Sequence, residues 1–309
     1  MSLHRLLSMR VGVPRPDQLA SFYREVGLTT DGAGQVTSPD GGTQVVIEEA
    51  PFRQLLGVEV GAGHERDLDE IHDRLGRLGV VSDGASGSGA LHAIDPASRV
   101  RFGVTVAEPL VQSASSVVVD NRPGAIVRRN ERAAAVFQGP RPPRRLGHIV
   151  IGTPDIAATQ RFLVDGLGFK VSDQADGIIS FLRCSTDHHN IALVHSPVPI
   201  LQHYSWECDD VDHVGHTATA LLRADEGRPV WGLGRHFAGS NFYWYLRDPS
   251  GSFIELFSDL DMIDDDDAWE AQRTPLAFEH VANTWGPNIP MEFIAPNDLP
   301  ELQAAWAAR

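Results

Sequence analysis

The sequence predicts an α+β protein of two domains, each built from two rounds of a β-α-β-β-β unit. Two observations lead to this prediction. First, the chain repeats itself in order: residues 11–22 and 151–162 share glycine, proline and phenylalanine at one offset, and the Asp-Pro segments at 94–98 and 247–251 correspond further along. Second, strand-like and helix-like hydrophobic periods alternate between these markers. A repeat of this order indicates two similar halves.

The second half shows the unit most clearly. Residues 146–151 are rich in β-forming side chains and end at Gly152 and Pro154, and Asp155 can cap the helix that follows. Gly168 ends this helix, as Gly27 does in the first half after a slip of one residue. A second helix is expected around residues 211–222, and further strands at 178–183, 191–194, 203–208, 241–246 and 253–257.

A connector separates the halves. Residues 107–145 lack a sustained hydrophobic period and end in a segment rich in proline and arginine. We therefore expect an N-terminal domain at residues 1–118, a connector at 119–144, a C-terminal domain at 145–262 and a tail at 263–309.

Composition excludes several functional classes. With 42% hydrophobic and 22% charged residues, the chain has the composition of an ordinary globular protein. Its net charge of −15 has the wrong sign for a nucleic-acid partner. Two cysteines, Cys184 and Cys208, cannot build a disulfide framework or a cysteine-rich zinc site. No apolar run reaches the ~20 residues of a spanning helix and no export signal is evident, so we expect a cytoplasmic protein without a membrane partner.

The halves differ at three positions where the second half carries potential metal ligands. Aligning the repeats places polar side chains in the second half opposite non-ligating ones in the first: His148 opposite Ser8, His203 opposite Leu55, and Glu255 opposite Phe102. A site built in only one half would produce this asymmetry. We therefore expect the chemistry in the second half.

Strand alternation explains why these residues should act together. Glu255 shares a strand face with Phe253 and Phe257, so its carboxylate lies in an apolar row. A bare buried carboxylate costs several kcal/mol unless it is paired or binds a metal. Two imidazoles, His148 and His203, with one carboxylate form the ligand set that suits non-haem Fe(II), although Zn(II) also accepts these donors.

The second half also resembles a known family. The segments that carry the resemblance are residues 146–150, 183–193, 202–207, 232–236, 242–251 and 253–257, with a shorter likeness at 285–287 in the tail. They are similar to the type I extradiol ring-cleavage dioxygenases of the vicinal oxygen chelate superfamily, such as catechol and dihydroxybiphenyl dioxygenases. The resemblance is dense from Arg145 to Asp261 and weak in the first half, which looks like the family's metal-free domain.

The resemblance implies a fold, a metal and an active site. Each domain would curl its two units into an open barrel, and the C-terminal barrel would hold Fe(II), or Mn(II) as in some members. His148, His203 and Glu255 would be the ligands. The catalytic residues would be His189 as the acid/base group, His236 as a hydrogen-bond partner of the substrate hydroxyl, and Tyr245, which would orient or help deprotonate the proximal oxygen. Of the pair His188 and His189, the residues that follow favour His189.

The resemblance also implies an activity, with two alternatives kept open. The expected reaction is cleavage of a catechol ring by O₂ next to its two hydroxyls, by a protein that assembles as a homo-oligomer. One alternative is a glyoxalase-type isomerase or lyase on the same scaffold with another divalent metal. The other is a metal-free protein that sequesters small molecules, which would have no need of His148, His203 and Glu255 together.

Overall fold

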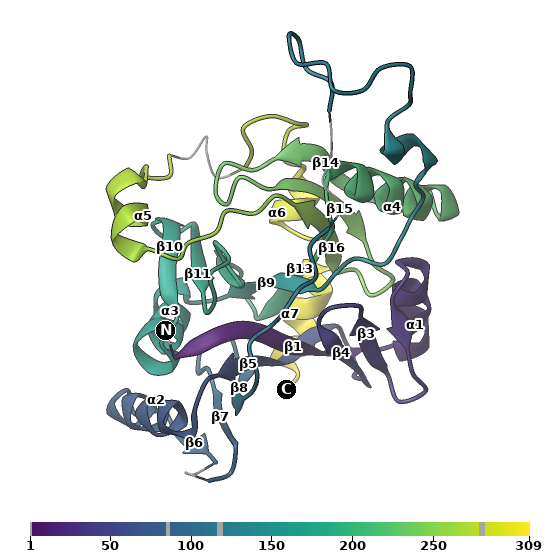
Figure 1. Ribbon diagram of the computed structural model, residues 1–309. Coiled ribbons are helices and arrows are strands. Elements are labelled where there is room, and N and C mark those ends of the chain that lie inside the picture. Colours follow the sequence, from purple (N-terminus) through teal and green to yellow (C-terminus); the bar gives the residue numbers. More distant parts are fainter. Residues whose placement is uncertain (1, 85–86, 116–119, 278–281) are drawn as a thin grey trace.

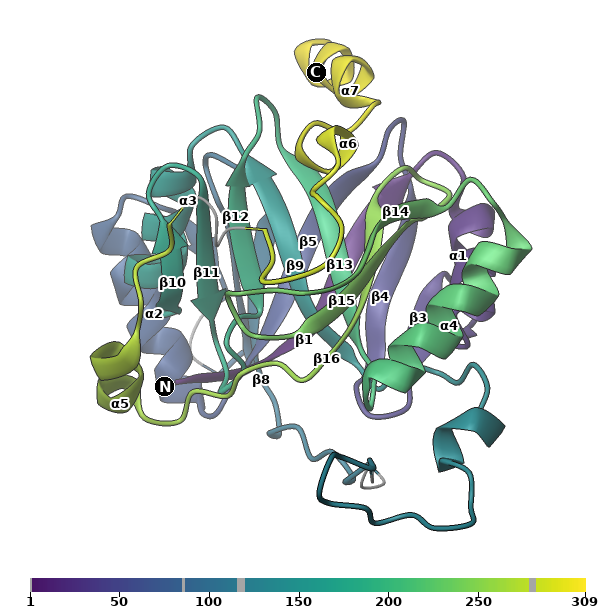
Figure 2. The same cartoon turned by 90° about the horizontal axis from the view of Figure 1, so that it is seen from above.

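Two eight-stranded mixed sheets form the body of the protein, and helices flank them (Figures 1 and 2). The structure is a computed structural model that describes residues 2–84, 87–115, 120–277 and 282–309. Each sheet belongs to one half of the chain, and this arrangement confirms the predicted α+β class and the pairing of units in each domain. Among the described residues, no helix is both long and apolar enough to cross a membrane.

The first sheet has the strand order β2-β3-β4-β1-β5-β8-β7-β6. Its strands are β1 (Leu3–Val13), β2 (Thr29–Thr30), β3 (Gln35–Ser38), β4 (Gly42–Glu49), β5 (Gln54–Ala62), β6 (Ser82–Asp83), β7 (Ala90–Ile94) and β8 (Arg101–Val106). Helix α1 (Pro16–Glu25) follows β1, and α2 (Glu65–Arg77) follows β5. Each helix is therefore the second element of one β-α-β-β-β unit.

The second sheet repeats this order as β10-β11-β12-β9-β13-β16-β15-β14. Its strands are β9 (Leu146–Thr153), β10 (Lys170–Ala175), β11 (Ile179–Arg183), β12 (Ile191–His195), β13 (Ile200–Glu207), β14 (Pro229–Arg235), β15 (Phe242–Arg247) and β16 (Phe253–Ser258). Helix α3 (Ile156–Arg161) continues as a π-helical turn, η2 (Phe162–Leu167), and α4 (Val211–Ala224) follows β13. The side chain of Asp155 caps α3 by accepting from the Ala158 amide, as the sequence predicts.

The repeat read from the sequence is confirmed where the helices end. Gly27 and Gly168 have φ angles of 98° and 93°, in the left-handed region that only glycine adopts without strain. Both residues stand at the point where a helix gives way to the next strand. The same backbone requirement explains why glycine occurs at both positions.

The register of the strands corrects two of the three predicted counterparts. Ser8 does correspond to His148, because β1 and β9 pair with β4 and β12 in the same register. Across the central strand pairs, however, the counterpart of His203 is Gly57 and that of Glu255 is Gly103. The pairings with Leu55 and Phe102 are wrong, by two residues and by one: these residues correspond to Leu201 and Ile254.

The misalignment comes from taking two glutamates as counterparts. The sequence comparison sets Glu59 against Glu207, but the register sets Glu59 against Ser205. The Glu59 side chain occupies the space beside Gly103, so a Cβ added there would lie 1.9 Å from Glu59 Oε2. The first half therefore still lacks the three ligands, because glycine has no side chain that could bind a metal.

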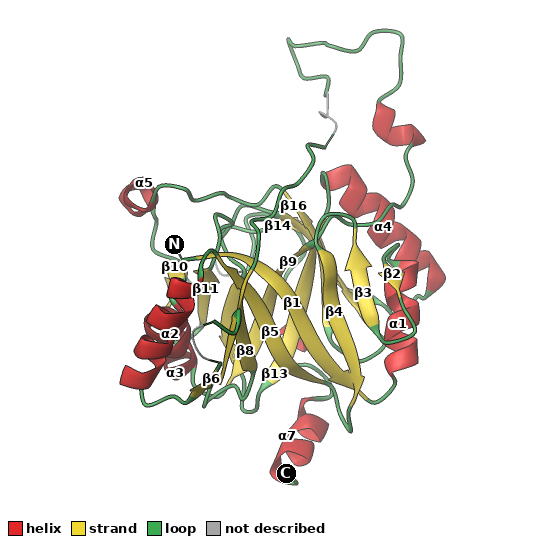
Figure 3. Ribbon diagram, turned by 60° about the horizontal axis from the view of Figure 1, so that its bottom comes forward, coloured by secondary structure: helices red, strands yellow, loops and turns green. Residues whose placement is uncertain are grey.

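The connector and the tail lie outside the two sheets. Between Val106 and Leu146 the described residues contain one short 3₁₀ helix, η1 (Ala134–Phe137), in a segment that projects away from the body (Figure 3). The predicted boundary between residues 118 and 119 lies outside the described residues. After β16 the tail contains α5 (Asp266–Gln272), α6 (Met291–Ile294) and α7 (Leu299–Ala307).

An aromatic cluster joins the two domains. Tyr23 of α1 is fully buried, and its ring centroid lies 5.8 Å from that of Tyr204 and 6.1 Å from that of Trp206, both in β13. These residues belong to a hydrophobic core that is continuous across both halves. The second sheet is therefore packed against the first domain through large aromatic side chains.

We expect Tyr23→Ala to lower the free energy of unfolding by about 3–5 kcal/mol, because it removes a buried aromatic ring and leaves a cavity. Chemical denaturation followed by tryptophan fluorescence measures the change. Val81→Ala is the control, since Val81 is 88% exposed and its truncation should change stability by less than about 0.5 kcal/mol. A loss below about 1 kcal/mol for Tyr23→Ala would contradict the assigned packing.

Candidate metal centre

Three neighbouring strands bring His148, His203 and Glu255 together. They lie in β9, β13 and β16, and β13 is hydrogen-bonded between the other two strands. Ser205 in β13 pairs with His148 on one side and with Glu255 on the other. His203 lies two residues before Ser205, so both side chains share one face of the strand. The sheet thus directs two imidazoles and a carboxylate to one point, and we call them the 2-His-1-Glu cluster.

The ligand atoms of this cluster converge. One atom from each residue lies within 4.8 Å of the others. The Nε2 atoms of His148 and His203 lie 2.8 and 3.5 Å from the same oxygen, Oε2 of Glu255. Glu255 is fully buried and the histidines are 2% and 6% exposed. These side chains therefore face one another in the interior instead of solvent.

Hydrogen bonds hold the carboxylate in place. The Ser205 hydroxyl donates to Oε2 of Glu255, and Asn241 Nδ2 donates to Oε1 at 3.1 Å. Burial by itself would raise the pKa of Glu255, but the adjacent His148 and His203 hold it well below its usual range. The carboxylate is therefore an ionised oxygen donor in a buried position.

The state of His203 suits a metal ligand. Burial lowers the pKa of His203 to about 3 although Glu255 opposes the shift, so the ring is neutral. Its Nδ1 contacts the Oε1 acceptor of Gln202, which leaves Nε2 with the free lone pair. Two nitrogen donors and one oxygen donor fit a divalent transition metal with coordination positions left open.

A cavity of about 450 Å³ adjoins the 2-His-1-Glu cluster. His148 and His203 line it, together with the three predicted catalytic residues, His189, His236 and Tyr245. Most of the remaining wall is apolar and includes Val150, Ile178, Ile179, Phe181, Val194, Trp231, Ala238, Ile289, Phe293 and Ile294. Among the described residues that line the cavity, none is Lys, Arg, Asp or Glu.

His236 and Tyr245 form a hydrogen-bonded pair in this cavity. His236 Nδ1 donates to the carbonyl oxygen of Ala282 at 2.6 Å, which leaves Nε2 to accept the Tyr245 hydroxyl at 2.9 Å. His236 Nε2 also lies 3.7 Å from Glu255 Oε1. Burial raises the pKa of Tyr245 well above its usual value, so the phenol keeps its proton.

The adjacent histidines 188 and 189 have different surroundings. His189 lines the cavity, and its ring centroid lies 4.2 Å from that of His148. Burial lowers the pKa of His189 well below its usual value, and the neighbouring histidines lower it further. His188 is fully buried behind it, and its Nε2 lies 3.0 Å from Asp173 Oδ2. The geometry thus places His189, and not His188, beside the 2-His-1-Glu cluster.

Several residues of the site were not predicted from the sequence. Ser205 and Asn241 donate hydrogen bonds to Glu255. Ser205 could have been predicted, because it lies two residues after His203 and therefore on the same face of the strand. Phe293 comes from α6 in the tail, and its ring lies 4.6 Å from that of Tyr245. The hydrogen bond from Gln202 Nε2 to the Phe293 carbonyl, at 2.8 Å, fixes this tail segment over the cavity. No local pattern indicates that contact.

Comparisons with known proteins agree with this geometry. Residues 145–256 match the model of the Glyoxalase/Bleomycin resistance protein/Dioxygenase superfamily. "Metapyrocatechase 2" of Cupriavidus necator is 38% identical over 154 residues, which are 49% of this chain and 47% of that protein. The chain therefore matches about half the length of this relative.

Solved structures extend the likeness to most of the chain. The Mn(II)-bound glyoxalase of Novosphingobium aromaticivorans has a TM-score of 0.70 at 24% identity, covering 94% of this chain and 93% of that one. The 2,2',3-trihydroxybiphenyl 1,2-dioxygenase of Sphingomonas wittichii strain RW1 has a TM-score of 0.70 at 19% identity, covering 94% and 100%. Residues 145–256 are thus similar in sequence to the glyoxalase and dioxygenase superfamily, and the likeness in fold to the solved structures extends over both halves.

We expect the purified chain to retain about one equivalent of Fe(II) or Mn(II) after anaerobic loading and desalting, and His148→Ala to retain less than about a tenth of that. Elemental analysis by mass spectrometry measures the metal. His195→Ala is the matched control, because His195 lines the cavity but lies outside the 2-His-1-Glu cluster. Equal metal content in wild type and His148→Ala would contradict this expectation.

Proposed function

We propose that the chain is an extradiol dioxygenase, which uses O₂ to open a catechol ring next to its two hydroxyls. The observation that carries the proposal is the buried 2-His-1-Glu cluster at the wall of an apolar cavity that also presents His189, His236 and Tyr245. The name of the Cupriavidus necator relative supports the same class of activity. A sequestering protein would gain nothing from burying three convergent metal ligands.

His148, His203 and Glu255 would hold the metal, and Fe(II) is the proposed ion. When bound, such an ion supplies binding sites for both substrate hydroxyls, lowers their pKa and provides a route for electrons to O₂. Mn(II) offers comparable chemistry, and the similar Novosphingobium structure holds Mn(II). We also propose a cytoplasmic location, as expected from the sequence, and the homo-oligomeric assembly that the resemblance implies. Light scattering tests the assembly.

His189 is the proposed acid/base residue. Its ring is neutral and lies against His148, so it can accept a proton from a substrate hydroxyl bound at the cluster. The protonated imidazole of His189 can then return that proton to a substrate oxygen that gains negative charge as the catechol ring opens. Its buried position keeps bulk water from competing for the proton.

His236 and Tyr245 would orient the substrate. Tyr245 donates to His236 Nε2 and lies with its ring centroid 5.0 Å from that of His203. A catechol oxygen bound beside His203 would therefore lie within reach of the phenol. Because Tyr245 keeps its proton, its hydroxyl can redirect its single hydrogen bond from His236 Nε2 to a catechol oxygen that has lost its own proton.

The cavity favours an uncharged, apolar ring substituent. Phe293, Trp231 and Phe181 supply aromatic walls, and no described lining residue is a Lys or Arg that could pair with a substituent carboxylate. An unpaired carboxylate buried there would lose its hydration without compensation. We therefore propose alkyl- or aryl-substituted catechols as the substrate class.

Fe(II)-loaded protein mixed with O₂ and a catechol panel should give coloured ring-fission products whose mass equals that of the substrate plus O₂. We expect kcat/KM for 3-phenylcatechol or 3-alkylcatechols to exceed that for 3,4-dihydroxyphenylacetate by roughly 10²-fold, because burial of the unpaired carboxylate costs several kcal/mol. Absorbance and mass spectrometry follow the products.

Two outcomes of this experiment oppose different parts of the proposal. Failure to form product from every catechol, with one equivalent of iron bound, contradicts the dioxygenase. Conversion of a thiohemiacetal by the same preparation would then favour the glyoxalase-type alternative. Equal kcat/KM for the carboxylated and apolar catechols contradicts the proposed substrate class alone.

The role of His189 is tested by His189→Ala. We expect kcat to fall by about 10²–10⁴-fold, because the positioned proton acceptor is lost, while the bound metal stays at the wild-type level. Steady-state kinetics and elemental analysis are measured on the same preparation. If the variant loses its metal as His148→Ala does, His189 is a ligand and the role assigned to it is wrong.

A further inference from the structure

Three side chains form a hydrogen-bonded chain that leads from the cavity into the protein. Nδ1 of His189 lies 3.0 Å from Nδ1 of His188, and Nε2 of His188 lies 3.0 Å from Oδ2 of Asp173. We propose that Asp173 and His188 are positioning residues that hold His189 in one tautomer and one orientation, with Nε2 as the free acceptor. This inference rests on the proposed role of His189.

The direction of the two hydrogen bonds follows from Asp173, the last of the three side chains. An ionised Asp173 can only accept, so His188 must carry its proton on Nε2. With that single proton, the His188 ring has a lone pair on Nδ1, and the 3.0 Å contact then requires Nδ1 of His189 to donate to it. The remaining nitrogen of His189, Nε2, is left with the lone pair that a proton acceptor in the cavity needs.

Packing fixes His188 in this position. It is fully buried, and its ring centroid lies 5.7 Å from that of Phe181 and 5.4 Å from that of Trp269. Its backbone amide donates to the Asp261 carbonyl at 2.8 Å. Trp269 is itself held by a 3.0 Å hydrogen bond from Nε1 to the Ser172 carbonyl. The ring therefore has little freedom to turn away from His189.

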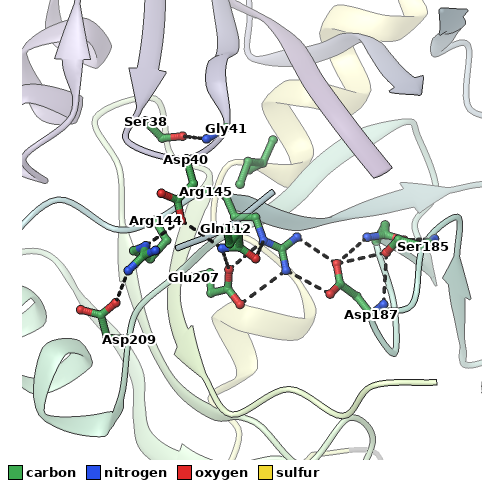
Figure 4. A network of polar contacts seen from close by, with 12 residues as sticks. Ser38, Asp40, Gly41, Gln112, Arg144, Arg145, Ser185, Asp187, Glu207 and Asp209 are labelled. Atoms are coloured by element: carbon green, nitrogen blue, oxygen red, sulfur yellow. Dashed lines mark hydrogen bonds and ion pairs between the residues drawn. The ribbon is translucent and has the colours of Figure 1, made fainter. Parts of the chain in front are cut away.

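A buried ion pair anchors the residue that precedes His188. Asp187 accepts hydrogen bonds from both Nη atoms of Arg145, at 2.9 and 3.0 Å (Figure 4). It also accepts from the Ser185 hydroxyl and from Asn190 Nδ2, each at 3.1 Å. Arg145 immediately precedes β9, the strand that carries His148, so the loop with the two histidines is tied to that strand.

This arrangement serves a proton acceptor at both stages of its task. Before the proton is transferred, the hydrogen bonds from Asp173 through His188 exclude the tautomer of His189 that has its proton on Nε2. After transfer, the doubly protonated ring still donates through Nδ1 to His188, so no side chain has to move. A purely structural role for the Asp173–His188 pair would need no contact with the cavity histidine, yet that contact is present at 3.0 Å.

The test is Asp173→Asn in the full-length chain. The amide keeps the shape of the side chain but can donate to His188 Nε2, which would reverse both hydrogen bonds and place the proton on Nε2 of His189. We expect kcat to fall by roughly 10- to 100-fold, with KM and bound metal within about twofold of wild type. Asp155→Asn is the matched control, because asparagine also caps a helix well.

A double-variant comparison separates positioning from simple destabilisation. A residue that acts through His189 has nothing to position once that ring is gone, so Asp173→Asn should have no further effect on kcat in the His189→Ala background. An equal fold loss in both backgrounds, or no loss in the wild-type background, overturns the inference.

Nitrogen-15 NMR of histidine-labelled full-length chain, with Zn(II) as a diamagnetic stand-in, gives a readout that does not depend on activity. We expect His189 to show a protonated Nδ1 and an unprotonated Nε2, and Asp173→Asn to exchange the two signals. The signal of His189 is identified by its loss in His189→Ala. A protonated Nε2 in the wild-type spectrum overturns the inference even if the enzyme is active, whereas the expected tautomer in a protein without dioxygenase activity refutes the proposed function alone.

Discussion

The fully buried carboxylate of Glu255 is the constraint on which the rest of the site depends. Such a group is costly unless every lone pair finds a partner. In this protein the partners are His148 in β9, His203 and Ser205 in β13, and Asn241 just before β15. The register of these strands in the second sheet therefore determines whether the Glu255 carboxylate finds its partners.

The two domains share a topology but differ at this point. In the first sheet the positions of His203 and Glu255 are glycines, and the Glu59 side chain fills the adjoining space. Glu59 is half-buried, and burial raises its pKa although His92 and Arg101 oppose the shift. The first domain instead contributes packing, because Tyr23 supports Tyr204 and Trp206 in β13, the strand that carries His203.

Local sequence patterns predicted the helices and strands, but they did not predict the contacts between residues far apart in the sequence. Gly27 and Gly168 could be matched because each meets a local backbone requirement. Leu55 is not the counterpart of His203, because Glu59 and Glu207 are the same residue type but differ by two residues in strand register, which the sequence does not show. Phe293 and Asp173 reach the site from segments far from its ligands, so only the folded chain brings them there.

The most direct measurement is anomalous X-ray diffraction from crystals of the chain loaded anaerobically with Fe(II). The account predicts a single strong peak about 2.0–2.3 Å from Nε2 of His148, Nε2 of His203 and a carboxylate oxygen of Glu255, with coordination positions left on the cavity side. A peak bonded to other side chains, or no peak in crystals grown from iron-saturated protein, would contradict it.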